Sequence, residues 1–129
     1  MPLMRVDMIK GRSNEEIRKI LDIAYQVASE EFHLLPRDRF QIVTQHEPEE
    51  MIIEDVGLDF TRTSRFLMFS ITSSPRQPED KKRFYARLVK ELNQQAGISP
   101  DDVMVNITCN TKEDWSFGHG EAQFLNGKL

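Results

Sequence analysis

Short runs in which apolar and polar residues alternate predict β-strands at four places in the chain. The first is Leu3 to Ile9, "LMRVDMI", where Met4, Val6 and Met8 share one face. Further strands are expected at Phe40–Gln45, from about residue 67, and at Val103–Thr108.

Two segments between these strands have the apolar spacing of amphipathic helices. Ser13 and Glu16 form a capping-box pattern that predicts the start of the first helix. In the second, Pro78 suits the first helical turn, and Gly97 is a favourable stop. The expected buried stripes are Ile17, Ile20, Leu21, Ala24, Val27, Ala28 and Phe32 in one helix, and Phe84, Tyr85, Leu88 and Leu92 in the other.

The second half of the chain repeats the first at an offset of 64 residues. Arg12 then falls on Arg76, and Asp38 falls on Asp102. Each half reads strand, helix, strand, and a helix that crosses between two strands normally makes them parallel.

The predicted fold is therefore α/β (α+β), a tandem β-α-β repeat that forms a four-stranded mixed sheet with two helices on one face. We expect one domain, 1–129, with repeat halves at about 2–46 and 66–110 and a C-terminal arm or hairpin at 113–129. The acidic connector between the halves should be looped, with a short extended piece at Met51–Ile53. Nothing in the chain remains to cover the second sheet face, which predicts a closed symmetric oligomer.

Composition argues against several function classes. Hydrophobic residues make up 39% and charged residues 29%, and the 21 acidic and 17 basic residues include no basic cluster, so no nucleic-acid partner is expected. No apolar run is long enough to span a membrane and no signal peptide is evident, so we expect no membrane association. A lone cysteine, Cys109, fits a reducing cytoplasm and is expected to be a small buried residue. The histidines lack metal-ligand spacing, and we expect no metal.

Pro2 allows two interpretations. Proline cannot donate to a strand ladder and is common at strand starts, which alone would explain its position. Alternatively, removal of Met1 would leave Pro2 with a free secondary amine at the end of a strand.

Several motifs resemble the tautomerase superfamily, and within it the malonate semialdehyde decarboxylases. They are "MPLMRVDMIKGRSNEE", "RDRFQIVTQHEP", "EDVGL", "GISPDDV" and, most specifically, "DWSFGHGEAQFLNG". The resemblance covers essentially the whole chain. It implies a homotrimer with active sites near subunit interfaces, no cofactor, and an amino-terminal catalytic proline, here Pro2.

The resemblance also implies the other site residues. Asp38 matches the catalytic aspartate, although its repeat counterpart Asp102 supports a simple strand-entry role. Arg76 matches one of two carboxylate-binding arginines, while Ser74 stands in place of the other. The pocket wall would consist of Trp115, Phe117, Phe124 and Leu129, each of which could equally be core.

Three functions follow from this pattern. The first is cofactor-independent decarboxylation of a small 3-oxo acid such as malonate semialdehyde. The second, favoured by Ser74, is enol–keto tautomerisation of a 2-oxo acid such as phenylpyruvate. The third is a non-catalytic trimeric binding protein. The protonation state of the Pro2 nitrogen separates the first two, because a protonated amine polarises a carbonyl and a neutral amine acts as a base.

Overall fold

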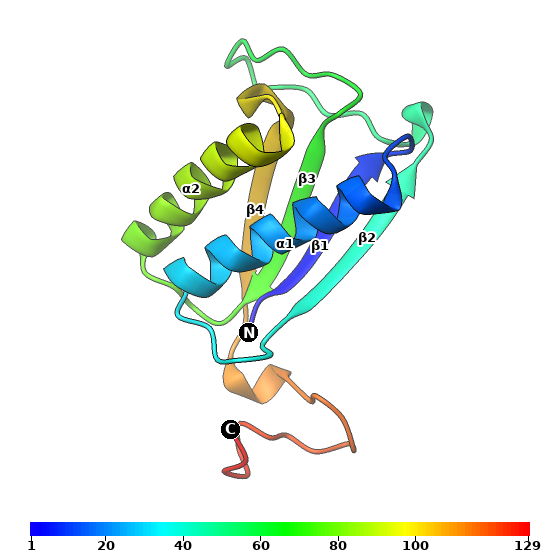
Figure 1. Ribbon diagram of the computed structural model, residues 1–129. Helices are drawn as coiled ribbons and strands as arrows, with labels where there is room; N and C mark the ends of the chain where they lie inside the picture. The colour runs from blue at the N-terminus through cyan, green and yellow to red at the C-terminus, as the bar shows by residue number, and fades with distance from the viewer.

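A computed structural model describes residues 1–129 and contains one four-stranded sheet with two helices packed on it (Figure 1). The strand order across the sheet is β2-β1-β3-β4. The elements are β1 (Leu3–Ile9), α1 (Asn14–Glu31), β2 (Phe40–His46), β3 (Leu67–Ser73), α2 (Pro78–Ala96) and β4 (Val103–Cys109).

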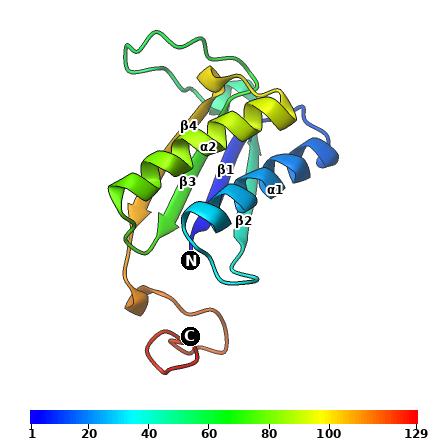
Figure 2. The same cartoon turned by 60° about the vertical axis from the view of Figure 1, so that its left-hand side comes forward.

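The pairing of the strands confirms the predicted fold. β1 pairs with β2 in parallel, β3 pairs with β4 in parallel, and the central β1 and β3 are antiparallel. Both helices lie on the same side of the sheet, and no element lies on the other side (Figure 2). The two β-α-β units thus lie side by side and point in opposite directions.

The helix boundaries lie where the capping residues were predicted. The Ser13 side chain accepts a hydrogen bond from the Glu16 backbone nitrogen at 3.1 Å, which caps α1. Gln77 precedes α2 and Pro78 occupies its first turn. Gly97 ends α2 with φ of 67°, a left-handed conformation that glycine adopts without steric cost.

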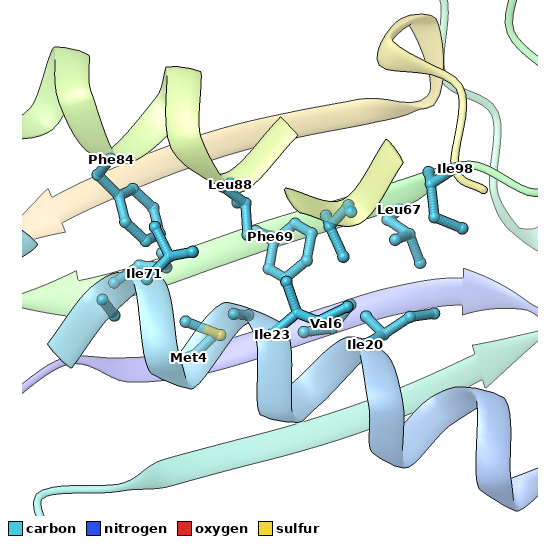
Figure 3. Close-up of a cluster of buried hydrophobic side chains, with 14 of the residues drawn as sticks. Met4, Val6, Ile20, Ile23, Leu67, Phe69, Ile71, Phe84, Leu88 and Ile98 are labelled. Atoms are coloured by element: carbon cyan, nitrogen blue, oxygen red, sulfur yellow. The ribbon is translucent and has the colours of Figure 1, made fainter. Parts of the chain in front are cut away.

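The core lies between the helices and the sheet (Figure 3). Met4, Val6 and Met8 project from β1 into this layer, as their alternation predicted. On α2, Tyr85 is partly exposed and does not belong to the buried stripe, because it lies one residue beyond the inward-facing Phe84. The remaining buried apolar residues are Ile20, Ile23, Ala24, Val27, Ala28, Phe32, Phe66, Leu67, Phe69, Ile71, Phe84, Leu88, Leu92 and Ile98.

The connector and the C-terminal segment form no strands, and one expectation for this part of the chain, a buried Cys109, is wrong. The connector is looped, as expected: it follows a short 3₁₀ helix at Pro48–Glu50, and Met51 has an extended backbone with φ of −146° and ψ of 98°. The C-terminal segment contains no hairpin; after a 3₁₀ turn at Lys112–Asp114 it folds through successive turns. Cys109 is exposed rather than buried, since it lies at the very end of the edge strand β4.

None of the helices is long and apolar enough to cross a membrane.

Candidate functional site

A pocket of about 580 Å³ opens at the end of the sheet where the chain begins. The N-terminus, the loop after β3 and the C-terminal segment all lie at this end (Figure 1), so residues far apart in the sequence meet there. The lining residues are Met1, His33, Leu34, Leu35, Pro36, Arg37, Asp38, Phe40, Ser74, Arg76, Phe117, Phe124 and Leu129.

Asp38 pairs with the amino terminus of the chain. The Met1 amine donates to Asp38 Oδ2 at 2.7 Å, and both groups are mostly buried. The other carboxylate oxygen, Oδ1, is buried and has no hydrogen-bond partner. Burial lowers the pKa of the Met1 amine, the bond and charge of Asp38 oppose this effect, and the positive charge of Arg76 adds to it. The two side chains identified from the sequence, Asp38 and Arg76, therefore act on the same terminal amine.

Pro2 is buried directly before β1 and lies close to this carboxylate. It shares with Asp38 the lining of a separate small cavity of about 10 Å³. With Met1 attached, the Pro2 nitrogen is a peptide nitrogen, so the amine that Asp38 holds belongs to Met1.

Arg76 follows β3 and is held by neutral groups. Its Nη1 donates to the Phe32 carbonyl oxygen at 2.7 Å, and its Nε donates to Ser73 Oγ at 3.1 Å. The guanidinium also lies over the Phe32 ring, with Cζ 5.1 Å from the ring centroid. Burial lowers the pKa of Arg76 and the negative charge of Asp38 raises it, but an arginine remains a cation throughout. No carboxylate of the protein pairs with it, so the Nη2 side of the fork is free to bind an anion.

Phe117 is the centre of the aromatic wall. It stacks on Phe40 with a centroid distance of 5.6 Å and meets Phe124 edge-on at 5.3 Å. Trp115 does not line the pocket; it stacks on Phe117 at 5.5 Å, and its indole nitrogen donates to Asn110 Oδ1 at 2.8 Å. Leu129 lines the pocket, as do Phe117 and Phe124.

The structure adds residues to this end of the sheet that the sequence reasoning missed. Phe40, His33 and Arg37 line the pocket, and Ser73 positions Arg76. The sequence identifies Phe40 only as the start of a strand. Its side chain lies in a pocket because Phe117 of the C-terminal segment stacks on it. The one sequence signal for Arg37 is its position between Pro36 and Asp38.

The two halves of the repeat use their matching aspartates differently. Asp102 is fully buried and accepts hydrogen bonds from the Thr63 backbone nitrogen at 2.8 Å and from Thr63 Oγ1 at 2.5 Å. Asp38 instead holds an amine and keeps one oxygen without a partner. The strand-entry interpretation therefore describes Asp102 well and Asp38 poorly.

No three His, Cys, Asp or Glu side chains gather in an arrangement that could hold a metal ion.

Comparison with known proteins points to one family. Residues 38–118 match the family model described as "Tautomerase enzyme". The chain is 47% identical over 129 residues to the probable tautomerase YrdN of Bacillus subtilis (strain 168), with all of both chains covered, and 29% identical to the probable tautomerase YusQ of the same strain, with 97% of this chain and 99% of that one covered.

Solved structures of malonate semialdehyde decarboxylase are also similar. One, of an enzyme with decarboxylase and hydratase activities, superposes with a TM-score of 0.96 at 42% identity, covering 98% of each chain. Another, the FG41 malonate semialdehyde decarboxylase inhibited by 3-bromopropiolate, gives 0.94 at 38% identity, covering 98% of this chain and 97% of that one.

Proposed function

Since this chain belongs to the tautomerase family, we propose that it is a cofactor-independent enzyme that decarboxylates a small 3-oxo acid such as malonate semialdehyde. The observation that carries the proposal is the placement of a terminal amine between a carboxylate and a free guanidinium in one pocket, with Asp38 2.7 Å from the amine. The catalytic form is the one from which Met1 has been removed. Pro2 then has a secondary amine, and it lines the same small cavity as Asp38.

The chemistry assigns one task to each group. Arg76 binds the substrate carboxylate through its free Nη2. The protonated Pro2 amine donates a hydrogen bond to the substrate carbonyl, or attacks it to form an iminium. The bond between carbon 2 and the carboxylate carbon then breaks, its electron pair moves toward the polarised carbonyl, carbon dioxide leaves, and a proton returns to carbon 2.

Asp38 keeps the amine protonated in this proposal. An α-amino group has an ordinary pKa of about 8, which burial lowers and a nearby carboxylate raises. On the Met1 amine burial is the larger of these effects and the pKa is lowered overall, while the bond and charge of Asp38 limit the fall. The apolar wall of Phe117, Phe124 and Leu129, with Trp115 stacked behind Phe117, would surround the reacting carbons.

A second candidate is enol–keto tautomerisation of a 2-oxo acid such as phenylpyruvate. The aromatic wall and the 580 Å³ volume would accommodate a ring, and Ser74 leaves Arg76 without a second arginine in this loop. Here Pro2 would be a neutral base that moves a proton between carbon and oxygen. If the purified protein retains Met1, the Pro2 nitrogen is not basic and only the non-catalytic binding protein remains.

An alkynyl halide tests the nucleophile directly. We expect 3-bromopropiolate to inactivate the enzyme and to leave a covalent adduct on a peptide that begins with Pro2. Intact-mass and peptide mass spectrometry would show both the loss of Met1 and the adduct. A fully inactivated enzyme with an unmodified Pro2 would refute the assignment.

The two matched aspartates should separate catalysis from stability. Asp102→Asn weakens the two hydrogen bonds that Thr63 donates to this buried carboxylate and should lower the free energy of unfolding by about 1–3 kcal/mol. Asp38→Asn should cost less stability but should lower kcat and move the alkaline limb of its pH profile to lower pH, because the amine that must be protonated loses its neighbouring anion and its pKa falls. Denaturant unfolding and pH–rate profiles of both variants check this, and equal profiles for Asp38→Asn and wild type would contradict it.

We also propose a homotrimer in the cytoplasm. The sheet face opposite the helices carries exposed apolar residues, including Ile42 on β2 and Met104 on β4. The protein should sediment at three times 15.1 kDa.

Charge placed on this face should dissociate the trimer. Ile42→Glu should give monomers, because an unpaired carboxylate would be buried at the interface. Ala86→Glu, on the exposed side of α2, should remain trimeric. Sedimentation velocity distinguishes the two outcomes, and a monomeric wild-type protein would refute the proposed homotrimer.

A further inference from the structure

The turn at the pocket mouth has an unusual residue at its third position. Residues Leu35 to Asp38 form a four-residue turn closed by a 3.1 Å hydrogen bond from the Asp38 nitrogen to the Leu35 carbonyl oxygen. Pro36 occupies the second position, and Arg37 the third, with φ of 67°. Glycine or asparagine is preferred there, because a side chain at positive φ meets steric resistance.

The Arg37 side chain makes no contact with the protein that would offset this unfavourable backbone conformation. It is exposed, lines the pocket, and makes no hydrogen bond or ion pair with the protein. Arg39, two residues later, behaves quite differently: it pairs with Asp22 at 2.7 Å and donates to Gln41 at 2.8 Å. Non-glycine residues at positive φ are concentrated at functional sites, and His33, at φ of 52°, lines the same pocket.

The charges around the pocket are unbalanced in favour of cations. The lining residues carry two anions, the Asp38 side chain, whose bonded oxygen is already matched by the terminal amine, and the terminal carboxylate of Leu129, against the Met1 amine, Arg37 and Arg76. Arg76 has only neutral partners, and Arg37 has none. Two guanidinium groups from different loops thus face one pocket in a protein whose formal charge is −4.

The size of the pocket matters as well. A volume of about 580 Å³ is within the range that holds a drug-sized ligand, so there is room for a molecule that extends from Arg76 to the mouth. Arg76 is partly buried and Arg37 is exposed, which gives the pocket an inner and an outer cation.

We infer that Arg37 is a second anion-binding residue and that the pocket prefers oxo acids with two acidic groups, the inner one on Arg76 and the outer one on Arg37. The inference rests on the proposed function only in that Arg76 holds a carboxylate. It names a substrate class, and Arg37 is its specificity-determining residue.

Binding of simple acids tests this without any turnover. Glutarate and adipate serve as diacids and valerate as the monoacid, titrated calorimetrically into the wild-type trimer at low salt and pH 8, where an ordinary histidine is neutral. We expect the better diacid to bind about tenfold more tightly than valerate, because a charge-assisted pair forms at the mouth. In Arg37→Gly this preference should fall to about twofold or less, and in Arg37→Lys most of it should remain.

Two controls make the result specific. Lys90→Gln changes the net charge equally at an exposed site on α2 and should keep the preference. Arg37→Gly should melt no lower than wild type, since glycine tolerates the positive φ, so a lost preference would not reflect a lost fold. The inference is overturned if wild type does not prefer diacids, or if the preference survives in Arg37→Gly. Failure of the proposed function would appear separately, as an absence of turnover with any oxo acid.

Discussion

Pro2→Ala should lower kcat by two orders of magnitude or more for decarboxylation and tautomerisation alike. The variant still begins with an amine once Met1 is removed, but a primary amine lacks the rigid ring that fixes its lone pair toward the substrate. A positioned acid or base typically contributes 10²- to 10⁴-fold to a rate. Steady-state kinetics on the processed variant, with removal of Met1 verified by mass, provide the measurement.

The structure makes this test specific, because position 2 lies directly before the core strand β1 and is buried. A strand-start role alone predicts reduced stability with activity unchanged per folded molecule. A melting curve recorded beside the kinetics therefore distinguishes a lost amine from a lost strand start. Activity within a few-fold of wild type in a folded Pro2→Ala variant would exclude Pro2 as the catalytic group.

Arg76→Ala should lower kcat/KM for every carboxylate substrate by roughly 10- to 150-fold, equivalent to about 1.5–3 kcal/mol for a hydrogen bond to a charged group. The free Nη2 of Arg76 is the inner cation of the pocket. Tautomerisation of an uncharged enol analogue should be nearly unaffected, because such a substrate has no carboxylate for Arg76 to bind. Parallel kinetics on the charged and uncharged substrates measure the difference.

Equal losses on both substrates would mean that Arg76 supports structure. This outcome has a physical basis, because Arg76 also ties the Phe32 carbonyl to Ser73 at the C-terminal end of α1. Ser74→Arg is the complementary variant. It should increase decarboxylation relative to tautomerisation by adding a second guanidinium to the same loop.

The order of the elements and the inward faces could be predicted from the sequence because both depend on local rules. Met4, Val6 and Met8 alternate at the period of a strand, and Ser13 and Gly97 act on the backbone next to them. The repeat also predicted that the two strands of each half pair in parallel, because strands joined by a crossover helix are normally parallel. The resemblance to a family singled out Asp38, Arg76 and Phe117, which the structure brings to one pocket.

Only the tertiary structure decided which of those residues meet and what surrounds them. Asp38 and Asp102 are equivalent in the repeat, yet one holds the terminal amine and the other is bonded to Thr63, because the connector and the N-terminus lie at opposite ends of the antiparallel β1–β3 pair. In the sequence Arg37 is likewise an ordinary surface arginine; only the tertiary structure shows that it lines the same pocket as Arg76. These contacts join segments that are distant in sequence, so neither local hydrophobic periodicity nor helix capping predicts them. They depend on how the sheet, the loops and the C-terminal segment pack together.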